Sequence, residues 1–425
     1  MGQVIICHCG AKAAYAYVET KIMDPESNGK SIIEQLFAKG KKLYHKTPNC
    51  LRWILWPATS IFKLIDALRL DLWIIVGDEI SSRQKLTMIY AGREKNRPFL
   101  IELAFGSSYR ENYIGKKWLW KIPDIARESN NDCSLMVMEV PKSFRILYGQ
   151  RKCLYIPSWV SGEIDISSHT KSDSVKTDMR RIRKNNLHFE VTNGLSQFDD
   201  FYHNMHVPYI AKTFGNRAVI ASYDFMRREF RKHGLYNDLL LIKREEEYIA
   251  GILLGYTKNA VHLHSVGVRD GNLDYVKDGA IGALFYFPAV YSKEKGYSKV
   301  NFGLSRAFLK DGVLQFKKKR GMQIVDASKI GFLIEVLSKT VGVKGFFLNN
   351  PFIYIDKMRF KAAIFVPSDQ SFSREDFARI YKDYYLRGLS KLVIYRIGEA
   401  NSGTWGVVPS EFSDTVAMCS ADSIF

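Results

Sequence analysis

The chain has 425 residues, 46% of them hydrophobic, so it can bury a large core and build two or three units. Its 62 lysines and arginines against 44 aspartates and glutamates give a formal charge of +18. This charge predicts an anionic partner: nucleic acid, an acidic membrane face or a phosphorylated carrier. Six scattered cysteines do not form a disulfide framework and favour a reducing, cytoplasmic setting.

The N-terminal segment shows neither a secretory signal nor a membrane span. Residues 1–20 lack a basic-then-apolar layout, and the longest uncharged run of the tryptophan-rich stretch, 53–62, is too short to cross a bilayer. We expect no transmembrane segment, while peripheral association with an anionic membrane stays open. Cys7-His8-Cys9 has no second pair of ligands elsewhere, so no metal site is expected.

The first half alternates between helical and strand-like segments. Residues 31–46 place apolar side chains on one helical face and lysines on the other, which predicts a helix. Short apolar runs predict strands at 71–76, 85–90, 98–105, 134–140 and 153–160. A polar and aromatic stretch, 109–120, interrupts them, and polar residues 163–174 predict a connection to the second half.

The second half repeats this order of elements. It predicts helices at 196–204, 223–232 and 279–294, and strands at 238–243, 249–256, 260–268 and 299–302. The strand–helix–strand crossing favours parallel pairing beside an antiparallel meander, so we expect an α/β fold with a mixed sheet flanked by helices. The matching order suggests a weak internal duplication, with chance alignment of common elements as the alternative.

The last hundred residues predict a smaller α/β extension. A helix is expected at 331–339, a strand at 360–366, a helix that Ser373 caps and Gly388 ends, and a strand at 392–395. The expected units are a degenerate N-terminal half (1–162), a core (175–328), an extension packing on it (329–398) and a loose tail (399–425).

Two histidines on one predicted strand are the first candidates for chemistry. His262 and His264 share one face of 260–268, because side chains repeat every second residue along a strand. A histidine can act as a general base near neutral pH, and His264 is the candidate base. The alternative is that both are satisfied polar residues beneath a helix.

The following helix offers a second group of candidates. Gly279 and Gly282 open it, and small residues at a helix start let backbone N–H groups approach a phosphate. Two glycines at a helix start also arise where a helix packs tightly on a sheet. Tyr286 on this helix is a candidate acid for a leaving thiolate, with aromatic packing as the alternative.

Cations after the last strand complete the set. Arg306 and the run from Lys317 to Arg320 flank a turn at Gly303, and such cations can bind a polyphosphate or a nucleic-acid backbone. A solvated helix end is the alternative. The chain has no P-loop, no paired zinc-ligand motif, no nucleophile elbow and no dinucleotide-binding fingerprint, so hydrolases, kinases and dehydrogenases lose their usual support.

Residues 174–321 resemble the GNAT-fold acyltransferases of the subgroup related to Fem peptidyltransferases, often named for a BioF2-like or CelD-like acetyltransferase domain. The matching segments are Asp178-Met-Arg-Arg-Ile-Arg-Lys184, Phe201-Tyr202, Pro208-Tyr209, Ile249-Ala-Gly251, Asp278-Gly279-Ala280, Asn301-Phe-Gly303, Gly312–Gly321 with Phe316-Lys317, and downstream Phe347–Phe352. The likeness covers about a third of the chain, counted by motifs. It departs from the GNAT pattern in one respect, because no Arg or Gln precedes Gly279 in the usual pyrophosphate loop.

The resemblance implies a GNAT-like core, doubled, that transfers an acyl group from acetyl-CoA or another acyl-CoA to an amine. His264 would act as base, Tyr286 as acid, Gly279, Gly282 and Lys317 as phosphate contacts, and Arg306 and His262 as substrate contacts. The acceptor would be an amine of a small molecule or an envelope precursor. Two alternatives stay open: a Fem-like transferase that uses aminoacyl-tRNA, bound by Arg180, Arg181, Arg183 and Lys317–Lys319, and an inactive protein that binds anionic ligands or membrane surfaces.

Overall fold

The computed structural model describes residues 68–106, 108–128, 133–144, 152–169, 172–215, 218, 220–398 and 407–424. The predicted helix at 31–46, the Cys7-His8-Cys9 cluster and most of the tryptophan-rich stretch lie outside these residues. Trp73 lies within them and is buried, with its ring stacked on Tyr90 at 5.6 Å. In the described ranges, no helix is both long enough and apolar enough to span a bilayer.

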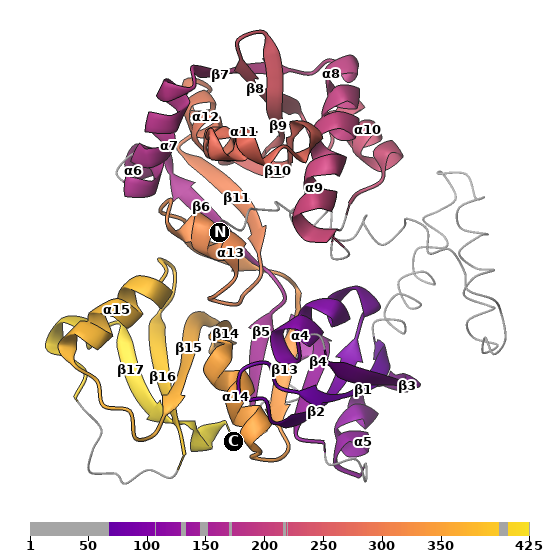
Figure 1. The fold of residues 1–425 in the computed structure, drawn as a ribbon, viewed down its shortest axis with the longest axis vertical. Coiled ribbons are helices and arrows are strands. Elements are labelled where there is room, and N and C mark those ends of the chain that lie inside the picture. The colour runs from indigo at the N-terminus through magenta and orange to yellow at the C-terminus, as the bar shows by residue number, and fades with distance from the viewer. Residues whose placement is uncertain are drawn as a thin grey trace.

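The first of three sheets has the strand order β3-β1-β2-β4-β13-β5 (Figure 1). Its strands are β1 (Arg69–Asp78), β2 (Lys85–Gly92), β3 (Tyr109–Trp118), β4 (Leu135–Pro141), β5 (Cys153–Pro157) and β13 (Ile330–Val336). Helices α4 (Arg97–Ala104) and α5 (Ile122–Glu128) bury apolar side chains in the two different hydrophobic clusters that this sheet separates. Short 3-10 turns, η3 (Glu94–Asn96) and η4 (Leu119–Lys121), lead into them.

The second sheet has the order β12-β6-β11-β10-β9-β8-β7. Its strands are β6 (Val160–Asp165), β7 (Leu187–Thr192), β8 (Asp238–Arg244), β9 (Glu247–Tyr256), β10 (Ala260–Val268), β11 (Lys299–Ser305) and β12 (Gln323–Ala327). Helices accompany it in chain order: α6 (Ile166–His169), α7 (Asp173–Lys184), α8 (Leu195–Asp200), the π-helix η6 (Phe201–His206), α9 (Val207–Phe214), α10 (Tyr223–Arg231), η8 (Arg269–Gly271), α11 (Leu273–Lys277), α12 (Ala280–Glu294) and α13 (Gly312–Lys318).

Helices cover both faces of this second sheet. Apolar side chains of α8, η6 and α10 form one cluster with Leu239, Leu241 and Leu253 of the sheet. On the other face α12 packs with Leu240, Ile252 and neighbouring strand residues. Because alternate side chains of a strand point to opposite faces, the nearly continuous apolar runs of β8 and β9 suit a sheet buried on both sides.

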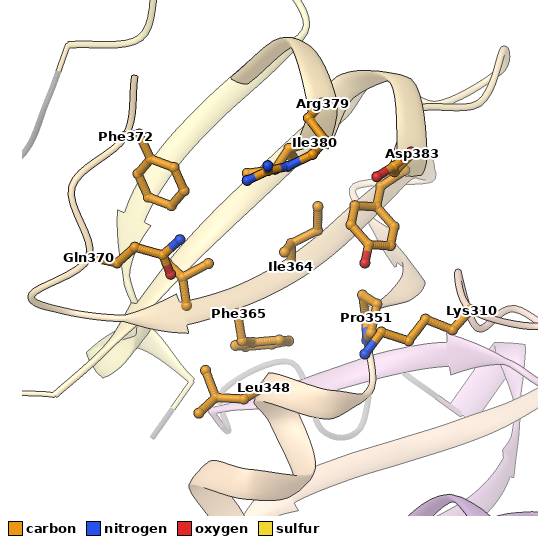
Figure 2. A pocket seen from close by; sticks show the side chains of 12 residues that line it. Lys310, Leu348, Pro351, Ile364, Phe365, Gln370, Phe372, Arg379, Ile380 and Asp383 are labelled. Carbon is orange, nitrogen blue, oxygen red and sulfur yellow. The ribbon is translucent and has the colours of Figure 1, made fainter. Parts of the chain in front are cut away.

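The third sheet, β14-β15-β16-β17, is smaller. Its elements are α14 (Val341–Asn349), β14 (Phe352–Asp356), β15 (Arg359–Pro367), α15 (Arg374–Tyr384), β16 (Lys391–Ile397), η9 (Ser410–Phe412), β17 (Val416–Ser420) and η10 (Ala421–Ser423). A cavity of about 240 Å³ lies between α15 and β15, with Leu348 of α14 at its floor (Figure 2). Two cations at its rim are already engaged, since Arg379 pairs with Asp376 and Lys310 donates to Asn349.

The predicted α/β fold, with mixed sheets flanked by helices, is confirmed. The strands β8, β9, β10 and β11 and the helix α12 fall where the sequence places them, and β10 and β11 run parallel. The first two sheets each hold antiparallel strands that lead to one parallel pair, β2/β4 or β10/β11, which is consistent with a duplicated unit.

Two predicted elements are wrong, and two stretches for which no element was predicted contain strands. The predicted strand at 98–105 is the helix α4, because Pro98 favours the first turn of a helix and Leu100, Ile101 and Ala104 share one buried helical face. The stretch 109–120 is mainly the strand β3, and the predicted helix at 331–339 is the strand β13. The tail is not loose throughout, because β17 pairs in parallel with β16.

Strand β13 also bears on the expected units. It lies between β4 and β5 of the first sheet, although the chain has by then passed through the second sheet. The expected boundary at residue 162 falls inside β6, which belongs to the second sheet. The first sheet is therefore built from strands that precede the second sheet in the chain and from one strand, β13, that follows it.

Candidate active site

The two central strands of the second sheet separate along their length. β10 and β11 pair only from Ala260–Lys299 to His262–Asn301, although both strands continue for several residues. Both also have irregular register with their outer partners at this level, β10 with β9 after Leu263 and β11 with β6 after Asn301. The sheet consequently has an opening between β10 and β11 beyond residues 262 and 301.

Side chains bond backbone groups of both strands at this level. The carbonyl of Val266 on β10 is bonded to Nδ1 of His206 at 2.7 Å. On β11, the carbonyl of Leu304 accepts from Nζ of Lys317 at 2.8 Å, and the amide of Gly303 donates to Oδ1 of Asn301 at 2.8 Å. Because buried backbone groups must be hydrogen-bonded, these three side chains satisfy backbone groups at the level where the register of β10 and β11 with their neighbours is irregular.

His206 reaches β10 because η6 lies directly against the strand. A Cβ at Gly267 would lie 2.5 Å from the backbone nitrogen of His206 and 2.6 Å from the carbonyl carbon of Met205. Only glycine at this position lets the π-helix come so close. The π-helix itself is an irregularity of the kind found at functional sites.

The environment of His206 fixes its protonation state. Its side chain is buried, and burial lowers its pKa to about 4 while the bond to the Val266 carbonyl opposes that change. The imidazole is therefore neutral at pH 7. A carbonyl only accepts, so Nδ1 carries the proton and Nε2 keeps its lone pair. Among the described residues Nε2 has no hydrogen-bond partner, so His206 is in the state that a general base requires.

The histidines predicted from the sequence do share one face of β10. Their rings stack at 6.3 Å, and Nε2 of His262 lies 3.2 Å from Oγ1 of Thr257. His264 is buried against the ring of Tyr236, and burial lowers its pKa to about 3. A Cβ at Gly255 would lie 2.5 Å from Nε2 of His264, so β9 closes over this imidazole.

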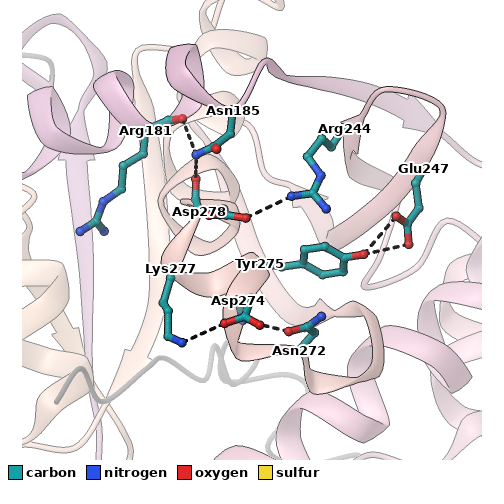
Figure 3. Close-up of polar contacts among 9 residues, drawn as sticks. All are labelled: Arg181, Asn185, Arg244, Glu247, Asn272, Asp274, Tyr275, Lys277 and Asp278. Carbon is teal, nitrogen blue, oxygen red and sulfur yellow. Dashed lines mark hydrogen bonds and ion pairs between the residues drawn. The ribbon is translucent and has the colours of Figure 1, made fainter.

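The glycines at the start of α12 serve a contact between helices. A Cβ at Gly279 would lie 2.8 Å from that of Arg181, and one at Gly282 would lie 2.6 Å from the carboxylate of Asp178. Nδ2 of Asn185 donates to the carbonyls of Arg181 and Asp278 at 3.1 and 2.7 Å and so ties α7 to α12 (Figure 3). Helix α7 thus covers the place where the sequence predicts a phosphate.

The remaining predicted residues lie in different places. Tyr286 is half-buried on α12 beside Phe287, and its hydroxyl has no hydrogen bond to a described residue. Arg306 lies between the first and second sheets, with its guanidinium 3.9 Å from the ring centre of Trp159 and 3.2 Å from Oδ1 of Asn96. Burial lowers the pKa of Arg306 to about 10, so it remains charged at neutral pH.

Lys317 is fully buried beneath β11, which rules it out as part of an exposed basic surface. The exposed cations of the predicted set are Arg180, Arg181, Arg183 and Lys319, while Lys318 is half-buried and donates to the carbonyl of Lys382. Arg320 is also buried and binds Asp178 through two nitrogens at 2.6 and 2.9 Å, which joins α13 to α7. The six-residue surface expected for a tRNA donor is therefore not continuous.

His206 was missed in the sequence because its role depends on a distant contact. The motif His206-Val207-Pro208-Tyr209 marks a helix break before Pro208, which was the available signal. Nothing local shows that this imidazole meets Val266 through the gap left by Gly267. Among the described residues, no group of three or more His, Cys, Asp or Glu is arranged to hold a metal ion.

No protein-family model matches the chain, and no curated protein matches its sequence. Several solved structures align with it. One is the C-terminal domain of a putative lysylphosphatidylglycerol synthetase from Agrobacterium fabrum, at 14% identity over 65% of this chain and 84% of that one, with a TM-score of 0.32. FemX aligns at 12% identity over 60% and 81%, with a TM-score of 0.32. A GCN5-related N-acetyltransferase from Anabaena variabilis aligns at 9% identity over 69% and 71%, with a TM-score of 0.27. These scores are too low for the matches to bear on the function of this chain.

Proposed function

We propose that this chain is an N-acyltransferase whose reaction takes place at the opening between β10 and β11. The observation that carries the proposal is the neutral His206, fixed by Val266 with its Nε2 unpaired, beside two parallel strands that have separated. The donor would be an acyl thioester such as acetyl-CoA. The acceptor would be an amine, and an envelope precursor is the class that the family resemblance implies.

The acceptor nitrogen attacks the carbonyl carbon of the thioester, and Nε2 of His206 takes the proton that the amine loses. The bond between carbon and sulfur then breaks, and the leaving thiolate gains a proton for which Tyr286 is the candidate donor. A backbone N–H of β10 would hold the developing oxyanion, an interaction that commonly contributes a large part of catalysis.

The acyl group could be carried by coenzyme A or by a tRNA. Because α7 covers Gly279 and Gly282, these residues do not fit the pyrophosphate of coenzyme A. The exposed Arg180, Arg181 and Arg183 on α7 favour, as a second candidate, an aminoacyl-tRNA donor, whose phosphates need an accessible basic surface.

The test compares three asparagine variants in one transfer assay. His206→Asn keeps a donor for the Val266 carbonyl, since Nδ2 of asparagine takes the place of Nδ1, but it removes Nε2. We expect this variant to lose transfer from acetyl-CoA to an amine panel by about 10²–10⁴-fold. His203→Asn, on the exposed side of the same π-helix, should keep full activity.

The third variant, His264→Asn, tests the base predicted from the sequence. If only His264→Asn loses activity, His264 and not His206 is the general base. Absence of acetyl-CoA turnover in the wild-type protein, together with salt-sensitive binding of bulk tRNA, would replace the thioester donor with aminoacyl-tRNA. If neither donor is used and anionic liposomes sediment the protein, the chain is a binding protein instead.

A further inference from the structure

A second cavity, of about 210 Å³, lies where α6, α7 and the end of α13 meet the segment between α15 and β16. It is lined by Asp165 at the end of β6, by Ser168, His169 and Ser172 around α6 and α7, by Arg320 after α13, and by Arg387 before β16. Because β6 runs antiparallel to β11, Asp165 pairs with Lys299 at the first residue of β11. The cavity is thus at the opposite end of β11 from the opening described above.

A buried histidine faces this cavity, and its one polar neighbour among the described residues is the backbone of Arg320. The side chain of His169 is 3% exposed, and neither of its ring nitrogens makes a hydrogen bond of normal geometry. Its ring meets Phe302 edge-on at 6.0 Å, and the backbone of Arg320 lies beside it. The backbone of Arg320 can serve only one of the two ring nitrogens, and a buried nitrogen left without a partner commonly marks a site for water, an ion or a ligand in native proteins.

The adjoining helix start is also unsatisfied. Ser172 is the N-cap residue of the 12-residue helix α7, but its side chain does not cap the helix. Its hydroxyl instead donates to the carbonyl of Lys319. The first N–H groups of α7 are therefore left without the side-chain acceptor that an N-cap serine normally provides, and the positive end of the helix dipole meets the cavity.

The charges around the cavity favour an anion. The guanidinium of Arg387 has no carboxylate partner among the described residues, whereas Arg320 is neutralised by Asp178. Asp165 is the opposing charge, and its carboxylate is engaged by the amide and hydroxyl of Ser167, which does not line the cavity. Asp173, in the first turn of α7, is bonded to Lys176. The guanidinium of Arg387, the uncapped backbone at the start of α7 and one ring nitrogen of His169 remain for a ligand.

We infer that this cavity binds a phosphate group, held by the start of α7, His169 and Arg387. A tetrahedral oxyanion accepts several hydrogen bonds at once, and backbone N–H groups at a helix start are a common site for it. Either inorganic phosphate or the phosphate of a monoester has this chemistry. The inference does not depend on the proposed acyl transfer.

The test is calorimetric titration of the full chain with inorganic phosphate and with adenosine 5′-monophosphate, against chloride at equal ionic strength. We expect saturable binding with one site and a Kd of about 1 mM or tighter. Arg387→Ala, a change on an exposed loop, should weaken it at least about tenfold by removing a charge-assisted hydrogen bond. Arg231→Ala, which removes an exposed cation of α10, should leave it unchanged.

His169→Phe supplies the second variant, since it keeps a ring of similar size and removes both nitrogens. Phosphate should no longer raise its unfolding temperature. Binding by the monoester alone would assign the cavity to a phosphorylated metabolite, and equal binding would assign it to free phosphate. Absence of saturable binding, or binding that Arg387→Ala does not change, would overturn the inference. The acyl-transfer assay of the same variants shows separately whether the proposed reaction is intact.

Discussion

Two parallel strand pairs of this molecule are built in opposite ways. β15 and β16 keep their register without interruption from Lys361–Lys391 to Pro367–Ile397. β10 and β11 stop pairing after His262–Asn301, and the buried side chains of His206, Lys317 and Asn301 bond the backbone that is left. The comparison shows that buried polar side chains bond the backbone where strand pairing ends. At β10 and β11 this happens within the strands, and at β15 it happens only beyond Pro367, where the buried Arg396 donates to the carbonyls of Ser368 and Gln370.

The largest expected difference between the β10/β11 region and the β15/β16 region is their loss of stability in acid. Burial lowers the pKa of His169 and His206 to about 4 and that of His264 to about 3, and all three lie in the second unit. Below pH 6.5 these histidines are protonated in the unfolded chain but stay neutral in the folded chain. The free energy of unfolding therefore falls as the pH drops towards 4. His206 alone would contribute a loss of about 3 kcal/mol over that range. The region of residues 341–424 contains no histidine.

Hydrogen exchange followed by mass spectrometry checks this prediction. Peptides from β10 should lose protection between pH 7 and pH 5, after correction for intrinsic rates, while peptides from β16 should keep it. Earlier opening of β16 would contradict the ordering. Replacing His264 with phenylalanine should make β10 less sensitive to acid.

Gly267→Ala tests the contact on which the opening depends. The new methyl group would press on the backbone of η6 at 2.5 Å, and a backbone has no easy way to move aside. Displacing His206 by about 1 Å is expected to reduce transfer by about 10²-fold. Gly296→Ala is the control, because it strains a backbone with a φ of 81° but its methyl group meets no atom. Equal activity of the two variants would mean that η6 does not position the base.

The smallest effect is expected at the closed pair. Ser373 and Asp376 form a reciprocal cap at the start of α15, which connects β15 to β16. Ser373→Ala should cost about 1 kcal/mol of stability, measured by denaturant unfolding, and should leave transfer unchanged. Ser371→Ala, just outside the cap, should cost less. A loss of transfer would show that the third sheet communicates with the opening.

The sequence predicts correctly those elements whose formation depends on neighbouring residues, such as apolar strands and a capped helix. The apolar runs of β8, β9 and β10 and the cap at Ser373 stand in the sequence itself. The strand β13 was mistaken for a helix because a strand buried on both faces has no alternation. The segment of α4 reads as a strand because its apolar run is short, and the helix signal is a single residue, Pro98, in the first turn.

The candidate site is harder to predict from the sequence than the fold, because it depends on contacts between distant segments. Residue spacing placed His262 and His264 on one face, but it does not report that β9 and Tyr236 bury His264. The separation of β10 from β11 rests on register shifts after Leu263 and Asn301, which no residue type announces. The contact between His206 and Val266 joins segments that only the folded sheet brings together.

The position of β13 has a consequence for how the chain is made. Because β13 is the strand that joins β4 to β5, the first sheet stays incomplete until residue 336 has left the ribosome. The second unit lies wholly between β5 and β13 in the chain, so it can fold while the first still waits for its last strand. The first sheet, whose strands β1 to β5 come early in the chain, can therefore complete its folding only late. A chain cut at residue 328 would lack β13, and β4 and β5 would lose the strand that pairs with both.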